Sequence, residues 1–577
     1  MPAPDQAGII HPAPAQWETF LRKWFIPLLL LGILVNAGGL LIPILEPDGS
    51  LYATISKTIA HTGDFINLRV EGKDWLDKPH FPFWMAALSF RLLGVSSFAY
   101  KFPALLFWGL GAWYTWRLAR SLYGETVSQL ATLIYVSAAH LVISNNDVRA
   151  EPYLTGLIIG SVYHFYKASR GRPGWHLIAG SLFAGCACMT KGPFVLITIG
   201  FGFILDWIVR KDWKQFLNIR WYIAIALTAL FTLPELYCLY VQFDLHPEKV
   251  VFGHTHVSGI RFFFWDSQFG RFFNTGPIKG SGDPFFYLHT LLWAFLPWSL
   301  LLYAAMIRKC RSLVTGGEDV AGTWICLGGA LVSFIVFSLS RFQLPHYLNI
   351  LFPFFAILTA EWLYGIRNPR SQKIIRTVQD SISILLPVLL LLLCWFFHFD
   401  NWLLQMIVFL LLAVLPLVVF RGPALPKPVT RSFWMAMLVF TFVNFSVYPT
   451  ILKYQAGTQA GNYLYRADGA DSTGPTAYLL QEAPVDYSFE FDCPRPVQRL
   501  TMDSLARTLT PSGKVLVFAP GSFADSLTRH GLHTTALASF PNFHISQLTG
   551  EFVNYRTRAS VLTPWSLFIV RRQPFAP

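Results

Sequence analysis

The feature that most constrains this chain is its succession of long apolar stretches separated by short polar loops. A transmembrane helix needs about 20 mostly apolar residues, and the sequence offers about thirteen such stretches. They lie near residues 24–44, 98–118, 125–143, 151–167, 175–190, 193–209, 221–240, 285–306, 321–339, 346–364, 378–398, 400–420 and 433–453. Only 13% of the 577 residues are charged, whereas soluble domains carry roughly 25%. The sequence therefore predicts an α-helical polytopic membrane protein.

The basic residues of alternate loops predict how the chain is oriented. Lys and Arg gather in the cytoplasmic loops of membrane proteins. Arg22 and Lys23 precede the first apolar stretch, and basic residues fill every second loop after it. This alternation, with an odd number of spans, predicts a bacterial inner-membrane protein with a cytoplasmic N-terminus and residues 455–577 in the periplasm. Since the net charge of +13 gathers at these membrane flanks, it does not indicate a nucleic-acid partner.

Two long outer segments and a polar tail divide the chain into two predicted domains. Residues 1–454 form the membrane domain, whose outer loops 46–97 and 241–284 are expected to form a site. Residues 49–61 and 81–93 are too short to span and predict amphipathic helices at the outer surface. The tail, residues 455–577, predicts a small α/β domain. Its patterns predict a strand at 513–520, a helix at 524–531 and a strand at 565–572.

Carboxylates and cations gather in the outer segments, where charge beside an apolar bundle is costly unless it binds something or does chemistry. These polar candidates are Asp48, Asp77, Lys78, Asp147, Arg149, Glu151, Lys191, Arg271, Arg341, His346 and Tyr347. Because the topology puts them all on one side, a shared site explains them more simply than independent loop ends do. Arg and Lys side chains bind phosphate well, and carboxylates suit a sugar or an acceptor hydroxyl.

Several of these residues also have a purely local interpretation. Asp48 is placed to cap a helix that begins near Gly49. Glu151 is placed to cap or begin the fourth apolar helix, near residues 151–167. Asp77 and Lys78 would make a surface ion pair. Lys191 would extend to the membrane interface, and Arg271 would pair with Asp266.

A set of motifs in a fixed order resembles a known family. The first is Asp48-x-x-x-Tyr52-Ala53, followed by Asp77-Lys78-Pro79. The others are RAEPYLTG at 149–156, MTKGP at 189–193, GRFF at 270–273, PFFYLHTLLWAFLPWS at 284–299 and LPHYLNILFPFFAIL at 344–358. In these motifs the chain resembles the membrane glycosyltransferases of the GT-C fold. It is most similar to the bacterial 4-amino-4-deoxy-L-arabinose lipid A transferases and to dolichyl-phosphate-mannose-protein mannosyltransferase-like enzymes, over most of residues 20–455.

The resemblance implies a transferase that takes a sugar from a polyprenyl-phosphate donor. It implies catalytic roles for Asp48 and Glu151, with Asp147 as a further candidate, and donor-phosphate binding by Lys78 and Arg271. The other expected phosphate contacts are Arg149 and Lys191, and the expected lining residues are Tyr52, Asp77, His346 and Tyr347. Asp77 stands where the family usually has Glu, and Asp266 stands near a position where some relatives have a metal-binding His. These two departures count against a bound divalent metal and against lipid A as the acceptor. If a divalent metal is a cofactor, Asp77 and Asp266 are its candidate ligands.

The reaction hypothesis is attack by a periplasmic acceptor on the anomeric carbon of an undecaprenyl-phosphate sugar. A hydroxyl acceptor needs a base, whereas a phosphate acceptor such as that of lipid A is already an anion. An acceptor Ser or Thr on a protein is the alternative within the same chemistry. A lipid transporter or flippase would place charges midway through several helices, and here most charges lie at the ends of the apolar stretches.

Overall fold

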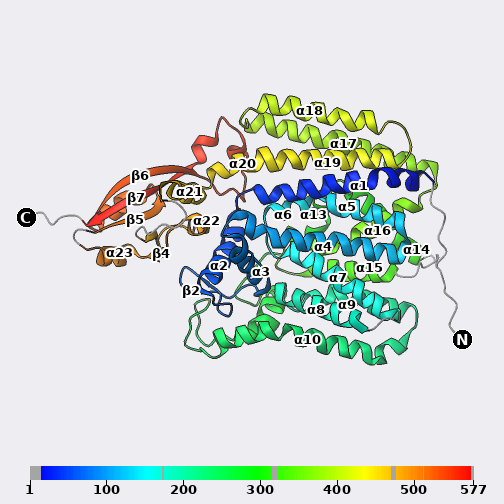
Figure 1. Ribbon diagram of the computed structural model, residues 1–577, viewed down its shortest axis with the longest axis horizontal. Coiled ribbons are helices and arrows are strands. Elements are labelled where there is room, and N and C mark those ends of the chain that lie inside the picture. The colour runs from blue at the N-terminus through cyan, green and yellow to red at the C-terminus, as the bar shows by residue number, and fades with distance from the viewer. Residues whose placement is uncertain (1–14, 172–173, 315–322, 469–475, 511–512, 573–577) are drawn as a thin grey trace, which may run out of the picture.

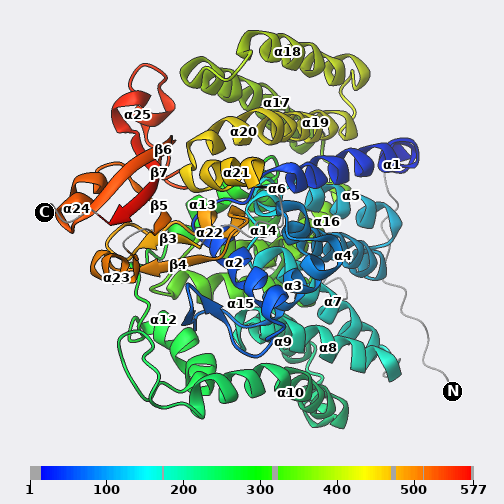
Figure 2. The ribbon, with the colours of Figure 1, turned by 60° about the vertical axis from the view of Figure 1, so that its left-hand side comes forward.

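The computed structural model describes residues 15–171, 174–314, 323–468, 476–510 and 513–572, and these form two parts. The larger part is a bundle of long helices whose axes run in roughly the same direction (Figure 1). A β-sheet with short helices lies beyond one end of the bundle. Helices α2 (Asp48–Thr62) and α3 (Phe81–Leu93) lie between the bundle and the sheet, as the turned view also shows (Figure 2).

The bundle helices follow the predicted apolar stretches, and each of the thirteen stretches contains at least one helix. They are α1 (Ala15–Gly38), α4 (Ser97–Tyr123), α5 (Glu125–Ser137), α6 (Ala139–Asn146), α7 (Glu151–Ser169), α8 (Gly174–Lys191), α9 (Val195–Val209), α10 (Ile219–Leu239), α13 (Phe286–Ala294), α14 (Ser299–Val314), α15 (Thr323–Leu339), α16 (Phe352–Gly365), α17 (Pro369–Phe397), α18 (Trp402–Val419) and α19 (Pro426–Phe442). A 3₁₀ segment, η5 (Pro345–Leu351), leads directly into α16.

The length and apolarity of these helices support a multi-pass membrane protein. Within the described residues, six helical segments are long and apolar enough to cross a membrane, and α5 with α6, bent by 50°, would make a seventh. The other bundle helices are shorter or carry more polar residues. A count of thirteen spans therefore stays a prediction, whereas the α-helical membrane fold is confirmed.

The connections that carry α2 and α3, and the loop that follows α10, also contain shorter elements. Strands β1 (Arg69–Val70) and β2 (Lys73–Asp74) form an antiparallel hairpin between α2 and α3. The helices predicted at 49–61 and 81–93 are confirmed as α2 and α3, and their place at the outer membrane surface stays a prediction. The loop that follows α10 carries α11 (Gly259–Arg261), the π-helical segment η4 (Phe262–Gly270) and α12 (Arg271–Phe273).

The C-terminal part is an α/β unit with a five-stranded mixed sheet in the order β4-β3-β5-β7-β6. The strands are β3 (Ala477–Leu480), β4 (Val497–Leu500), β5 (Lys514–Pro520), β6 (Leu532–Asn542) and β7 (Thr563–Arg572). Its helices are α21 (Ala456–Asp468), α22 (Tyr487–Asp492), α23 (Met502–Thr508), α24 (Phe523–Arg529) and α25 (Gly550–Val553). The predicted strands at 513–520 and 565–572 and the predicted helix at 524–531 correspond to β5, β7 and α24, and the α/β class is confirmed. The domain boundary at residue 455 stays a prediction.

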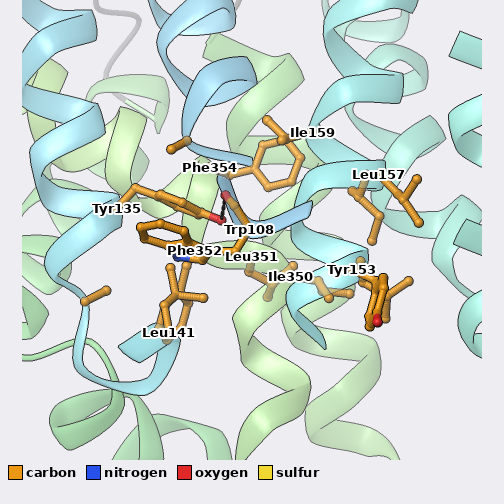
Figure 3. Close-up of a cluster of buried hydrophobic side chains, with 14 of the residues drawn as sticks. Trp108, Tyr135, Leu141, Tyr153, Leu157, Ile159, Ile350, Leu351, Phe352 and Phe354 are labelled. Carbon is orange, nitrogen blue, oxygen red and sulfur yellow. Dashed lines mark hydrogen bonds between the residues drawn. The ribbon is translucent and has the colours of Figure 1, made fainter. Parts of the chain in front are cut away.

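A buried aromatic and aliphatic cluster holds the centre of the bundle together (Figure 3). Trp108 of α4 stacks on Tyr135 of α5, whose hydroxyl donates to the Trp108 carbonyl at 3.1 Å. Phe352 and Phe354 of α16 lie in the same cluster and are fully buried. Since η5 precedes α16 directly, this packing fixes the position of the segment that carries His346 and Tyr347.

Helices α4 and α7 approach closely through small residues, as membrane helices often do. A Cβ atom built on Gly156 of α7 would lie 2.2 Å from the carbonyl oxygen of Phe107 in α4. Any larger side chain at Gly156 would push α7 away from α4, and Glu151 at the start of α7 would move with it.

Asparagine side chains join the first helix of the bundle to its last. Asn145 at the end of α6 donates to the side chain of Asn36 in α1 at 2.7 Å. Asn146 donates to Asn444, just after α19, at 2.8 Å, and Asn444 in turn donates to the Val35 carbonyl of α1 at 2.8 Å. Buried amides of this kind link membrane helices by hydrogen bonds rather than by apolar burial. These hydrogen bonds hold the bundle together near the C-terminal end of α1.

Candidate active site

The predicted site residues meet in one polar cavity at the end of the bundle that faces the sheet. The cavity has a volume of about 140 Å³ and is lined by Asp48, Tyr52, Asp77, Lys78, Arg149, Glu151, Lys191, Arg271, His346 and Tyr347, together with Ala150, Ile278, Phe342 and Leu344. Every predicted catalytic, phosphate-binding and lining residue is in this set except Asp147. Asp147 reaches the cavity through its ion pair with Arg149.

Two carboxylates share one guanidinium at one side of the cavity, and we call this group the acidic triad. Arg149 lies 2.6 Å from Asp48 Oδ2 and 3.0 Å from Asp147 Oδ2. Asp48 is the first residue of α2, and Asp147 and Arg149 lie in the turn between α6 and α7. The local interpretation of Asp48 is wrong, because Pro47 occupies the cap position of α2 without a side-chain cap and the Asp48 carboxylate pairs with Arg149.

Two cations share one carboxylate elsewhere in the cavity, and we call this group the basic triad. Lys78 Nζ lies 3.0 Å from Asp77 Oδ2, and the Arg271 guanidinium contacts Asp77 Oδ1. Arg271 also lies over the ring of Phe342, which the sequence did not single out. The expected pairing of Arg271 with Asp266 is wrong. Asp266 instead lies 3.7 Å from Arg261. Arg261 ends α11, and Asp266 belongs to η4, which follows α11 directly.

The charges of the basic triad change one another's protonation. Burial raises the pKa of Asp77, but the charges of Lys78 and Arg271 outweigh it and hold that pKa below its ordinary value. Burial lowers the pKa of Lys78, and the Arg271 charge lowers it further. The surplus positive charge therefore costs free energy until an anion joins the group.

Glu151 and Lys191 form a third pair at the floor of the cavity. Lys191, the last residue of α8, contacts Glu151, the first residue of α7, and lies 3.6 Å from the centre of the Tyr347 ring. His346 Nε2 is 3.8 Å from Glu151 Oε1. Glu151 is only 2% exposed and α7 has no side-chain cap. Lys191 does not extend away to the interface, so its local interpretation is wrong. Glu151 does begin α7, as its local interpretation has it, but its carboxylate does not cap the helix and pairs with Lys191 instead.

The loop that carries the basic triad is fixed by a buried pair that the sequence analysis did not predict. His80 and Glu235 of α10 are both fully buried, and His80 Nδ1 lies 3.1 Å from Glu235 Oε1. Burial lowers the pKa of His80, but the Glu235 carboxylate outweighs it and raises that pKa above its ordinary value. His80 Nε2 donates to the Ile66 carbonyl at 2.9 Å. A carboxylate inside an apolar stretch was the sequence signal for this pair, because such charges are rarely retained without a partner.

The donor set does not fit a metal centre. Among the residues that the structure describes, no three His, Cys, Asp or Glu side chains come close enough to hold an ion. Of the two candidate ligands, Asp77 is held by two cations and Asp266 lies outside the cavity lining. We therefore assign no step to a metal.

Apolar cavities lie next to the polar one. A cavity of about 90 Å³ shares Lys191, Arg271 and Tyr347 with it and is otherwise lined mostly by apolar residues. A larger cavity of about 560 Å³ lies between α8, α9 and α10 and is almost entirely apolar. A third cavity, of about 30 Å³, lies around Lys78 and Arg271. Phe263 borders both this cavity and the larger apolar one. A charged head placed at the basic triad would thus have apolar space beside it within the bundle.

The fold of the chain is of the GT-C type. The chain superposes on the crystal structure of ArnT from Cupriavidus metallidurans with a TM-score of 0.71 and 17% identity, covering 96% of this chain and 98% of that one in the apo state. The same protein bound to undecaprenyl phosphate gives the same score. This likeness confirms the fold that the motifs imply.

Sequence comparison points to particular relatives. A profile of the family described as dolichyl-phosphate-mannose-protein mannosyltransferase matches residues 77–237. The chain is 28% identical over 325 residues to the undecaprenyl phosphate-alpha-4-amino-4-deoxy-L-arabinose arabinosyl transferase of Edwardsiella ictaluri, and 26% identical over 391 residues to that of Enterobacter sp.. The match spans 55% of the first relative and 65% of the second. The resemblance stated from the motifs is confirmed.

Proposed function

We propose that this chain is a glycosyltransferase that moves a sugar from an undecaprenyl-phosphate donor to a periplasmic acceptor. The observation that carries the proposal is the presence, in one cavity, of a triad with surplus negative charge and a triad with surplus positive charge. The named relatives suggest 4-amino-4-deoxy-L-arabinose as the sugar and lipid A as the acceptor. A bound lipid phosphate would supply the anion that the basic triad lacks.

The proposed reaction is a substitution at the anomeric carbon of the donor sugar. An acceptor oxygen forms a bond to that carbon, and the bond from the carbon to the lipid phosphate oxygen breaks. The electron pair of the broken bond stays on undecaprenyl phosphate, whose growing charge Lys78 and Arg271 stabilise. Tyr347 supports this role, since its hydroxyl is hydrogen-bonded to Arg271.

Asp48 has a role that depends on the acceptor. With a hydroxyl acceptor, its carboxylate takes the proton as the new bond forms. With a lipid A phosphate, which is already an anion, the carboxylate stabilises the positive charge that develops on the sugar. The ion pair with Arg149 holds the Asp48 carboxylate in place in both cases. The 560 Å³ apolar cavity is the space that we assign to part of the polyprenyl chain.

Reconstitution of the purified chain in lipid vesicles tests the proposal. With undecaprenyl-phosphate 4-amino-4-deoxy-L-arabinose and lipid A, we expect a glycosylated lipid A and an equal amount of free undecaprenyl phosphate by mass spectrometry. Transfer of mannose to a Ser- or Thr-containing peptide would favour the protein mannosyltransferase chemistry of the matched family profile. Movement of the lipid across the bilayer without any transfer would contradict both.

The orientation is part of the proposal: the N-terminus is cytoplasmic and the C-terminal α/β unit periplasmic. The alternation of basic loops supports it. A reporter fused after Pro577 should be active only if it functions in the periplasm. Activity of a strictly cytoplasmic reporter at that position would contradict the orientation.

A further inference from the structure

Helix α22 of the C-terminal part lies beside α2, the helix that begins at Asp48 (Figure 2). The beginning of α22 is bound by the residue two positions before Asp48. The side chain of Glu46 accepts a hydrogen bond from the Ser488 backbone N–H at 2.7 Å. Burial and the neighbouring Asp486 carboxylate raise the pKa of Glu46 well above its ordinary value, so the protonated Glu46 carboxyl donates to Asp486. Asp486 caps α22 by accepting from the Phe489 backbone N–H at 2.9 Å. The segment that leads into Asp48 is therefore tied to the first turn of α22.

The other end of α22 is bound by Lys57, which lies on α2. Its ammonium group donates to the carbonyls of Glu490 at 3.0 Å, Phe491 at 2.7 Å and Cys493 at 3.1 Å. An ammonium group has three donors, so these contacts use all of them. The carbonyls at a helix end have no partner within the helix. Lys57 therefore satisfies the end of α22 as well as holding α2 against it.

These two ties bracket Asp48, and a third contact lies between them. The Thr54 hydroxyl of α2 donates to the Tyr487 carbonyl at 3.3 Å. Because Glu46 contacts the beginning of α22 and Lys57 its end, the two helices cannot slide past each other without breaking a hydrogen bond. Asp48 lies in the segment so held, and its carboxylate faces the cavity.

A fourth contact binds the loop of the basic triad to the same C-terminal unit. Arg499 of β4 lies 2.7 Å from Glu71 in the turn between β1 and β2, and both side chains are almost buried. The guanidinium also donates to the Ala483 carbonyl at 2.6 Å. The C-terminal unit thus contacts, at two places, the segment 46–97, which supplies the two triads with residues 48, 77 and 78.

We propose that the C-terminal unit is a positioning element of the transferase, in which α22 holds Asp48 in place through Glu46 and Lys57. This inference rests on the proposed function. Glu46 and Lys57 do not line the cavity and so are positioning residues rather than catalytic ones. Displacement of a reacting group by about 1 Å can lower a rate by roughly 100-fold, so loss of either tie should affect kcat.

The test compares variants of the full-length protein in vesicles. Lys57→Met removes the three donors and keeps the length of the side chain. Glu46→Leu removes both hydrogen bonds at the other end, whereas Glu46→Gln keeps an acceptor for Ser488 and a donor for Asp486. We expect kcat to fall roughly 10- to 100-fold in Lys57→Met and Glu46→Leu and to stay within about threefold of the parent in Glu46→Gln. The affinity for undecaprenyl phosphate should stay unchanged in all three, because Lys78 and Arg271 remain.

Arg558→Met is the matched control. Arg558 also joins the C-terminal part to the bundle, by donating to the Phe397 carbonyl of α17 at 2.6 Å, but it makes no contact with α2. Its kcat should stay near that of the parent. An equal loss of kcat in Arg558→Met would overturn the proposal, because general loosening of the domain would then explain the result. Equal losses in Glu46→Leu and Glu46→Gln would overturn it too.

Amide hydrogen exchange of residues 48–62 separates this inference from the proposed function, because it needs no substrate. We expect faster exchange in Lys57→Met and Glu46→Leu than in the parent and Glu46→Gln. Unchanged exchange, or faster exchange with an unchanged kcat, would overturn the positioning role. Absence of transfer by the parent from the undecaprenyl-phosphate donor would contradict the proposed function instead, and the exchange measurement would still decide the tie. If Lys57→Met does not fold, the two Glu46 variants decide alone.

Discussion

The acidic and basic triads are built from the same kinds of side chain and carry opposite surplus charge. Asp48 and Asp147 share one guanidinium, whereas Lys78 and Arg271 share one carboxylate. Both triads join an outer segment near the start of the chain to a residue far along it. Arg149 lies 101 positions after Asp48, and Arg271 lies 194 after Asp77. The two triads therefore differ in their numbers of acidic and basic side chains rather than in the way they join distant parts of the chain.

That difference teaches what each triad is able to do. In an ion pair of one carboxylate and one cation, the two charges neutralise each other. An additional charge without a partner in a partly buried cavity raises the free energy of the empty site. The surplus carboxylate suits an acceptor proton or a sugar that becomes positive. The surplus cation suits a phosphate. Substitutions that change the net charge of the acidic triad should thus lower turnover and leave donor binding unchanged. Substitutions that change the net charge of the basic triad should alter donor binding.

The largest expected effect comes from the acidic triad. Asp48→Asn keeps the shape of the side chain but removes the surplus charge, and we expect kcat to fall roughly 100- to 10,000-fold. Donor binding should hardly change, because the basic triad is intact. Turnover measured with the purified variant checks this, and Glu248→Gln, an exposed carboxylate on an outer loop, is the control. Turnover near that of the parent would remove Asp48 from the mechanism.

The basic triad should show the converse pattern. Lys78→Met and Arg271→Met each remove one contact to the phosphate, and such charge-assisted contacts contribute about 1.5–3 kcal/mol. We expect undecaprenyl phosphate to bind roughly 10- to 150-fold more weakly in each variant. Direct binding to vesicles that contain the protein measures this, and Lys279→Met, an exposed cation of the same outer loop, controls for net charge. Two variants that bind as tightly as the parent would place the phosphate elsewhere.

A larger surplus of positive charge in the basic triad should strengthen the binding of undecaprenyl phosphate rather than weaken it. Asp77→Asn leaves Lys78 and Arg271 without their carboxylate, so a phosphate no longer competes with it. We expect undecaprenyl phosphate to bind about fivefold more tightly, equivalent to about 1 kcal/mol, and the ligand-free protein to melt at a lower temperature. Weaker binding would show that Asp77 orients the two cations more than it competes with the ligand.

The smallest expected effect concerns a neighbour of the basic triad. Tyr347→Phe removes the hydroxyl that is bonded to Arg271 but keeps the ring beneath Lys191. The hydroxyl oxygen accepts from the guanidinium, so its loss removes only a contact that orients Arg271. Affinity for undecaprenyl phosphate should fall roughly two- to fivefold, equivalent to about 0.5–1 kcal/mol, with kcat nearly unchanged. Tyr347→Leu removes the ring as well, and a loss no larger than that in Tyr347→Phe would show that the ring contributes nothing.

The sequence predicted which residues meet in the cavity, because the order of apolar stretches puts their loops at the same end of the bundle. It also predicted helices α2 and α3 and the main elements of the C-terminal sheet. The likeness of the motifs to a family added the expected GT-C fold. Asp147 was the one predicted residue that reaches the cavity only through another side chain.

The sequence did not predict which charges pair, because pairing depends on the relative placement of loops that are far apart in the chain. Asp266 is five residues from Arg271 and was the nearest candidate, yet Arg271 pairs with Asp77. The partner of Glu235 was invisible for the same reason. Nor did local patterns reveal the role of Lys57, since its partners are backbone carbonyls of a helix more than 400 positions later, and carbonyls carry no sequence signal.

The hydrogen bond from Asn444 to the carbonyl of Val35 bears on how the chain is made. The two residues are 409 positions apart, and synthesis at about 5–20 residues per second separates their emergence by roughly 20–80 s. During that time the first helix resides in the bilayer without the helix that completes its contacts. The contacts of α1 are thus completed only after Asn444 has been synthesised, later than every residue that lines the polar cavity, the last of which is Tyr347.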